Sequence, residues 1–303
     1  MEPPRGIFPM LYAFFDEGGR LDRSAFRWQI EAVLAAGAHG VAILGLMTEV
    51  GALSPLERRT LVEWAVEDIA GRAPLMATIA GEDLAVVTAL AQAAEAAGAA
   101  MLVFQPPLGA KPDEAKLAAF FETAMASVSI PAGPQNAPEF LGVGLSPRAI
   151  VALAERRPNF LLMKGEGPVV AVKPFIDALA GRVAVFNGRG GLELTDNLRA
   201  GCTGMVPAPD CADIQIAVYE AWRRGDEARA DALYETILPY VVFAMQSLAV
   251  AIPLGKRMFA MRAGIENACA CRVAPDDVDP FLVAAMRRWS SRFGRYASHG
   301  GTP

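Results

Sequence analysis

One unit is repeated eight times along the chain: a short apolar run, a loop marked by glycine or proline, and an amphipathic, alanine-rich stretch. The eight apolar runs, which we expect to be strands, are residues 7–12, 40–44, 75–80, 100–104, 130–135, 160–163, 183–186 and 204–206. Intervening stretches carry apolar residues at three- and four-residue spacing, which is typical of helices; examples are residues 55–70, 84–97, 113–128 and 147–156. Eight such units in succession favour a closed parallel barrel over an open sheet.

We therefore predict an α/β fold, a (β/α)8 TIM barrel over residues 1–224, followed by a C-terminal helical extension over residues 225–303. Within the extension, residues 236–255 have no charged side chain, a length that could cross a bilayer. Two prolines lie near the ends of this stretch, and Gln246 and Ser247 interrupt its middle. We interpret it as a helix buried on all sides, within the protein or at a contact between subunits.

The composition narrows the class of protein further. The 28 basic residues are outnumbered by 33 acidic ones, for a net charge of −5, which argues against a nucleic-acid or membrane partner because such partners bind basic surfaces. The cysteines are too few and too irregularly spaced for a disulfide framework; they are Cys202, Cys211, Cys269 and Cys271. The first residues lack the apolar segment of a signal peptide. We expect a cytoplasmic protein.

Histidine is scarce, which argues against several kinds of catalytic site. His39 precedes the second strand, at the end of the barrel opposite its mouth, and His299 lies in the C-terminal tail. Cys269 and Cys271 have no second pair at the spacing of a zinc site. A Ser-His-Asp or Cys-His arrangement lacks its histidine. We expect no metal and no organic cofactor.

Lys164 is the strongest candidate for chemistry. It alone among the five lysines follows a wholly apolar run, at the C-terminal end of the sixth strand, and barrel enzymes place their chemistry at this end of the strands. The charged form of a lysine amine is costly at the apolar mouth of a barrel, so the neutral form is favoured. A neutral amine can attack a ketone to form an imine, which acts as an electron sink. The same position also suits a lysine whose charge merely reaches solvent, so position alone leaves the two readings equal.

Motifs around these positions resemble the class I, Schiff-base-forming lyases typified by N-acetylneuraminate lyase and dihydrodipicolinate synthase. The family's G-x-x-G-E loop corresponds to Gly-Leu-Met-Thr-Glu at residues 45–49, and its Tyr-Asn-x-Pro segment to Gln-Asn-Ala-Pro at residues 135–138. The resemblance covers nearly the whole chain, and it implies that Lys164 forms the imine with a small-molecule 2-oxo acid. It also implies a homodimer or homotetramer. The substrate-binding positions that it implies are Met47, Thr48, Gln135, Asn136, Gly188 and Val206.

The chain departs from the synthase pattern at the residues of the proton relay. Leu46 and Met47 stand where the family has hydroxyl residues, and Gln135 replaces the tyrosine before Asn136. The hydroxyl that the synthase takes from a neighbouring subunit falls near Leu108, and its substrate-gripping arginine falls near Phe140. We therefore expect little dihydrodipicolinate synthase activity.

A subset of the family, the sugar-acid dehydratases resembling L-2-keto-3-deoxyarabonate dehydratase, matches better. These also have glutamine before Ala-Pro in the fifth strand and a glutamate two residues after the lysine, as Glu166 is here. Eliminating water needs an imine, a base for the C3 proton and an acid for the leaving hydroxide. Glu166 could supply the acid–base chemistry, or it could lie in solvent or pair with Arg189. Gln135 and Asn136 could orient hydroxyls or a water, and Asn136 could equally cap its turn.

Three functional hypotheses follow. The leading one is a Schiff-base lyase or dehydratase on a 2-oxo acid, with a 2-keto-3-deoxy sugar acid as the substrate. The second is a pyruvate-releasing aldolase or a dihydrodipicolinate synthase-like enzyme. The third is a catalytically impaired 2-oxo-acid-binding protein, because several polar positions of the site are apolar. Glu49 is expected to hold its loop by bonding backbone amides rather than to act in catalysis.

Overall fold

The structure, a computed structural model, describes residues 3–109, 111–265, 270–273 and 279–296. Its eight strands are β1 (Gly6–Ile7), β2 (Val41–Ile43), β3 (Leu75–Ile79), β4 (Met101–Phe104), β5 (Ala132–Asn136), β6 (Leu162–Gly165), β7 (Ala184–Asn187) and β8 (Gly204–Met205). They form one sheet in the order β1-β8-β7-β6-β5-β4-β3-β2, and every pair of neighbours is parallel. Each apolar run of the sequence overlaps one of these strands.

The sheet closes on itself between its first and second strands. The amide of Leu11 donates to the carbonyl of Ala42 over 2.8 Å, and the amide of Ala42 donates to the carbonyl of Pro9 over 2.9 Å. Met10 and Ala42 form a parallel bridge at the same place. The (β/α)8 barrel predicted from the repeat is therefore confirmed.

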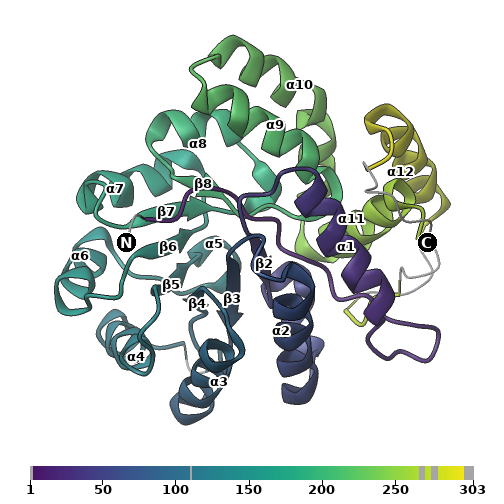
Figure 1. Cartoon of the computed structure of the whole chain (residues 1–303). Coiled ribbons are helices and arrows are strands. Elements are labelled where there is room, and N and C mark those ends of the chain that lie inside the picture. Colours follow the sequence, from purple (N-terminus) through teal and green to yellow (C-terminus); the bar gives the residue numbers. More distant parts are fainter. Residues whose placement is uncertain (1–2, 110, 266–269, 274–278, 297–303) are drawn as a thin grey trace.

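Helices surround the barrel (Figure 1). They are α1 (Arg23–Ala35), α2 (Pro55–Ile69), α3 (Leu84–Ala97), α4 (Glu114–Ala126), α6 (Pro147–Arg156), α7 (Val169–Leu179), α8 (Leu194–Ala200) and α9 (Ala212–Arg223), with a short α5 (Pro138–Leu141) in the loop after β5. The predicted helical stretches 84–97 and 147–156 have the bounds of α3 and α6. Ser54 caps α2, accepting from the amide of Glu57, which fixes where the helix begins.

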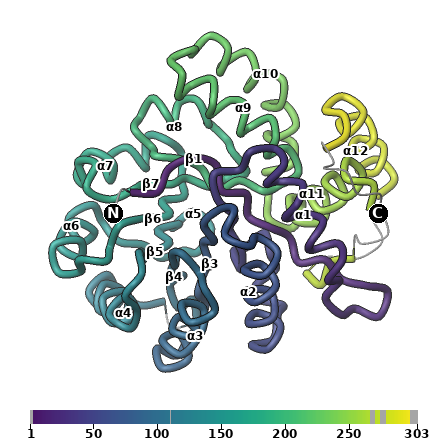
Figure 2. The backbone as a smooth tube through the Cα atoms, viewed as in Figure 1, coloured from purple at the N-terminus to yellow at the C-terminus, as the bar shows by residue number. Residues whose placement is uncertain are grey.

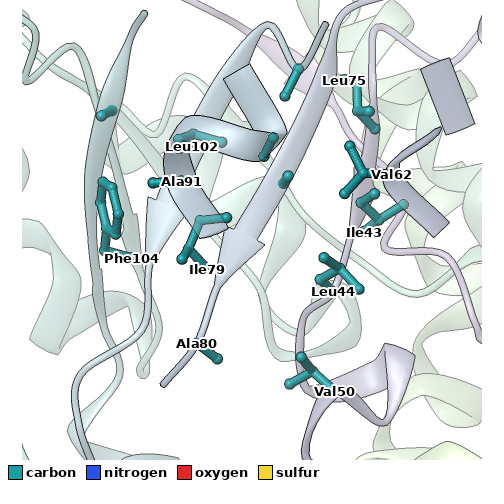
Figure 3. Packing of buried hydrophobic residues seen from close by; sticks show 14 of the residues in the cluster. Ile43, Leu44, Val50, Val62, Leu75, Ile79, Ala80, Ala91, Leu102 and Phe104 are labelled. Carbon is teal, nitrogen blue, oxygen red and sulfur yellow. The ribbon is translucent and has the colours of Figure 1, made fainter. Parts of the chain in front are cut away.

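Two apolar layers hold the barrel together. Its interior is filled by large side chains from several strands, including Phe8, Met76, Val103, Leu162 and Phe186. A second layer lies between the strands and the surrounding helices, where Figure 3 shows Ile43, Ile79 and Phe104 gathered with Val62 of α2 and Ala91 of α3. Strands buried on both faces explain why the eight runs are almost wholly apolar rather than alternating.

Among the described residues after the barrel lie three helices: α10 (Glu227–Ala244), α11 (Leu248–Ala263) and α12 (Pro280–Phe293). Figure 2 shows α11 and α12 at one side of the barrel. Phe259 and Ala263 of α11 pack with Ala25 and Ala32 of α1 in one apolar cluster. The helical extension predicted after residue 224 is therefore present.

The expectation of one fully buried helix over residues 236–255 is wrong. The stretch is divided between α10 and α11, and Ser247 caps α11 by accepting from the amide of Val250. Val242 is 54% exposed on the single chain, so burial on all sides within the protein is also wrong, whereas burial at a contact between subunits stays a prediction. No helix in the described part of the chain has the length and apolar character that crossing a membrane requires.

Candidate active site

Lys164 lies near the end of β6, where the strand opens into the mouth of the barrel. The register pairs it with Gln135 of β5 on one side and with Phe186 of β7 on the other. Only 4% of Lys164 is exposed. The alternative of a lysine that reaches solvent is therefore wrong. A buried ammonium is costly unless a partner is provided.

Glu166 is that partner, and Gln135 holds it in place. The Lys164 Nζ atom lies 3.1 Å from Glu166 Oε1, with both side chains at most 6% exposed. The Gln135 Nε2 group donates to Glu166 Oε2 over 2.6 Å. One oxygen of the Glu166 carboxylate thus accepts a hydrogen bond from the Gln135 amide, which fixes its orientation, and the other oxygen contacts the Lys164 amine. The alternatives in which Glu166 lies in solvent or pairs with Arg189 are therefore wrong.

Gly188 makes room for this carboxylate. A Cβ atom added at Gly188 would fall 2.0 Å from Glu166 Oε1, much closer than atoms can approach. Any larger residue at the end of β7 would push Glu166 away from the amine. Glycine at this position allows the Glu166 carboxylate to approach the backbone closely, which is a common reason for glycine beside a functional side chain.

A cavity of about 370 Å³ opens above the amine. Its lining is mostly apolar and consists of Met10, Leu46, Met47, Phe140, Lys164, Glu166, Arg189, Gly190, Val206, Ala208, Met245 and Leu248. The structure thus brings Met47 and Val206 together with Lys164 and Glu166, as expected of substrate-binding positions. A mostly apolar pocket with a few convergent polar groups is typical of a small-molecule site.

The side chains of Thr48 and Asn136 bond to backbone groups outside the cavity. The Thr48 hydroxyl donates to the carbonyl of Leu11 over 2.6 Å. The Asn136 side chain donates to the carbonyl of Leu145 and accepts from its amide, over 3.1 and 2.7 Å. Neither residue lines the cavity. Their side chains hold backbone segments in place, and for Asn136 this is close to the capping alternative.

Arg189 and two residues of the extension are cavity residues that sequence reasoning missed. The Arg189 side chain is 14% exposed and pairs with Glu139 and Glu193, each over 3.1 Å. Its place directly after Gly188, at the end of β7, was an available signal. Met245 and Leu248 lie far along the chain, and no motif announces them.

Glu49 accepts from backbone amides, as expected, but from a distant segment rather than from its own loop. Its Oε2 atom accepts from the amides of Arg272 and Val273 over 2.7 and 3.0 Å. Its other oxygen bonds to Lys256, and both side chains of this pair are fully buried. The loop that carries Met47 is therefore fastened to the C-terminal extension.

The chain is similar in sequence to known proteins. The model of the dihydrodipicolinate synthetase family matches residues 3–273. L-2-keto-3-deoxyarabonate dehydratase of Azospirillum brasilense is 30% identical over 78% of each chain. A 4-hydroxy-tetrahydrodipicolinate synthase of Methanopyrus kandleri is 28% identical over 77% of this chain and 79% of its own.

Solved structures show the same fold. The structure of YagE from Escherichia coli K12, a member of the dihydrodipicolinic acid synthase family in complex with pyruvate, superposes with a TM-score of 0.87. The match covers 95% of this chain and 98% of that one at 24% identity. Dihydrodipicolinate synthase from Rhodopseudomonas palustris has a TM-score of 0.87 at 19% identity, over 96% and 99% of the two chains. The resemblance inferred from the motifs is thus confirmed, and the chain belongs to the dihydrodipicolinate synthetase family.

Proposed function

We propose that the protein is a class I lyase that forms a Schiff base between Lys164 and a 2-oxo acid, and that it dehydrates a 2-keto-3-deoxy sugar acid. The observation that carries this proposal is the buried contact of Lys164 with Glu166, oriented by Gln135. Family membership and the similarity to a sugar-acid dehydratase support it.

The roles follow from the chemistry of the imine. The Lys164 amine attacks the C2 ketone and water leaves, giving an iminium that acidifies the C3 protons. A carboxylate beside the amine can take one C3 proton, leaving an enamine. The enamine then expels the C4 hydroxyl, which departs as water once Glu166 returns the proton. Glu166 therefore acts first as base and then as acid. The conjugated iminium that remains loses a C5 proton and is protonated at C3, and the resulting C5 enol tautomerises to a carbonyl. Water then hydrolyses the iminium, which releases the dioxo acid and frees the Lys164 amine.

Aldol cleavage starts from the same iminium but needs a base on the C4 hydroxyl. Gln135 occupies the position of the family's tyrosine, and an amide has no useful basicity. Moreover, the Gln135 amide is already engaged with Glu166. These observations favour dehydration, although a YagE protein of Escherichia coli, for which 2-dehydro-3-deoxy-D-gluconate aldolase activity is proposed, is 29% identical over 77% of this chain and 79% of its own.

Product analysis tests the proposal. The protein is incubated with five- and six-carbon 2-keto-3-deoxy sugar acids, and in parallel with pyruvate and aspartate semialdehyde. We expect a dehydrated dioxo acid without free pyruvate, which is a semialdehyde from the five-carbon acid and a diketone from the six-carbon acid, and little condensation product. Pyruvate release would favour the aldolase, efficient condensation would favour the synthase, and an imine without turnover on any acid would favour the binding protein.

The family resemblance implies that the functional protein is a homodimer or homotetramer. Light scattering on the purified protein measures its mass directly, and a monomer would contradict this part of the proposal.

A further inference from the structure

A second cavity adjoins the one at Lys164. Its volume is about 240 Å³. The two cavities lie side by side, because they share four lining residues: Met47, Gly190, Ala208 and Met245. The second cavity extends away from the amine, between the loop after β8 and the extension helices α10 and α11.

Asp210 and Tyr240 supply the polar groups of the second cavity, whose other lining residues are apolar or glycine. Asp210 is 7% exposed and Tyr240 is 1% exposed, and the Tyr240 hydroxyl donates to Asp210 Oδ2. Burial raises the pKa of Asp210, while the Tyr240 hydrogen bond and the charge of Arg262 act in the opposite direction. A carboxyl whose neutral form is favoured can donate as well as accept.

A second hydroxyl lies beside this pair. Tyr12 Oη is buried and has no hydrogen-bond partner among the described residues. A Cβ atom at Gly255 of α11 would fall 2.1 Å from Tyr12 Oη and 3.3 Å from Asp210 Oδ2. The glycine therefore leaves open the space in which the tyrosine hydroxyl and the carboxyl approach each other. Buried polar groups are costly without partners, so a polar cluster of this kind suits a site that receives hydroxyl groups.

We propose that Asp210 and Tyr240 form a subsite for the distal hydroxyl groups of the substrate, on the side of the cavity remote from Lys164. The inference rests on the proposed function, in which Lys164 holds the 2-oxo end. A hydroxyl both donates and accepts, which matches a carboxyl and a phenol side by side. The apolar residues shared by the two cavities face the carbon chain between these ends. The subsite thus selects polyhydroxy acids over short ones such as pyruvate.

Calorimetry with unreactive acids tests the subsite separately from the imine. The probes are lactate and 2,4,5-trihydroxypentanoate, which carry a 2-hydroxyl in place of the 2-oxo group and cannot form an imine. The measured quantity is the preference for the longer acid, given by the ratio of the two dissociation constants. Three variants are compared with the wild type: Tyr240→Phe, Ala251→Leu, which fills the second cavity, and Tyr219→Phe, a control on α9. Thermal melting checks that each variant folds.

We expect the wild type to prefer the longer acid, and Tyr240→Phe to reduce this preference by about threefold to tenfold, as the loss of one hydrogen bond predicts. Ala251→Leu should reduce it by about tenfold or more, because a clash excludes the longer chain. The control should keep the wild-type preference. Absence of a preference in the wild type, or an unchanged preference in both Tyr240→Phe and Ala251→Leu, overturns the subsite.

Borohydride trapping of pyruvate on the wild type is run in parallel. If trapping fails while the preference and its loss are observed, the proposed function fails and the subsite stands. If trapping succeeds while the preference is absent, the subsite fails and the proposed function stands.

Discussion

The carboxylate of Glu166 has two neighbours with different effects on it. Lys164 Nζ lies 3.1 Å from one oxygen, and Gln135 donates to the other. The amide fixes the direction of the carboxylate without competing for its proton, because an amide nitrogen is a donor alone. In the proposed mechanism, imine formation and proton transfer therefore belong to two different groups, the Lys164 amine and the Glu166 carboxylate.

Replacing Glu166 by glutamine tests this separation. Glu166→Gln should keep borohydride-trappable imine, because Lys164 is untouched. Turnover should fall by about 10²–10⁴-fold, the usual effect of a lost acid–base group. Glu155→Gln, an exposed position on α6, is the control and should behave as the wild type. Full activity in Glu166→Gln would remove this residue from the mechanism.

The residues whose place could be predicted from sequence are those at the ends of strands. Lys164 and Glu166 were expected at the mouth of the barrel, where the structure has them, because the end of a barrel strand has a defined place in the fold. Their roles stay predictions. Thr48 and Asn136 were expected in the cavity but bond to Leu11 and Leu145. Such side-chain bonds depend on how a loop folds back, which the pattern of apolar residues does not encode.

At the scale of elements, the fully buried pair of Lys256 in α11 and Glu49 links the extension to the β2–α2 loop. Lys256→Met should lower the free energy of unfolding by about 3–5 kcal/mol, because it leaves a buried carboxylate without its cation. Lys173→Met removes an exposed ion pair and should cost about 1 kcal/mol or less. Urea unfolding measures both, and the double variant Glu49→Gln/Lys256→Met should recover part of the loss. Equal effects of the two single variants would contradict the role of the pair.

A second link between the extension and the barrel depends on pH. The Arg272 hydrogen bond lowers the pKa of Glu57 in α2 from 4.5 to about 2. A carboxyl whose pKa is lowered by folding stabilises the folded state at pH values above the pKa that it has in the unfolded chain. This stabilisation is lost as the pH falls through the pKa that it has in the folded protein. Glu57→Gln should therefore melt at a lower temperature than the wild type at pH 7. The difference should narrow as the pH falls from about 4.5 towards 2.

Glu63→Gln, on the exposed side of the same helix, is the control for this series. A melting difference for Glu57→Gln that stays constant across the pH range would mean that its carboxylate charge is not what matters.

The types of the elements could be predicted from the periodicity of apolar residues, but the boundary between α10 and α11 could not. The eight strands and the helices between them have distinct patterns, and serine caps mark where α2 and α6 begin. The uncharged stretch 236–255 is split because Ser247 caps a new helix. Pro239 and Pro253 lie inside α10 and α11 rather than between them. A long apolar stretch hides such a break, since hydrophobicity alone does not distinguish one helix from two.

At the scale of the whole molecule, we propose that the barrel, residues 1–224, and the extension, residues 225–303, unfold as one unit. The extension contributes Met245 and Leu248 to the cavity, and Arg262 of α11 bonds to Asp213 and to the carbonyl of Asp210. Tryptophans lie in both parts, among them Trp64 and Trp289. Urea unfolding followed by tryptophan fluorescence and by far-UV circular dichroism should give coincident transitions. Two separated transitions would show that the parts are independent.

The proposed mechanism requires that Lys164 carries the substrate as an imine, and the mass of the intact protein followed by peptide mapping detects this bond. With pyruvate and borohydride, we predict one reduced adduct per chain, located on Lys164. Lys164→Ala should abolish both the adduct and turnover, since removing a covalent nucleophile costs orders of magnitude in rate. An adduct on Lys111, Lys116, Lys173 or Lys256, or turnover that survives in Lys164→Ala, would contradict the account.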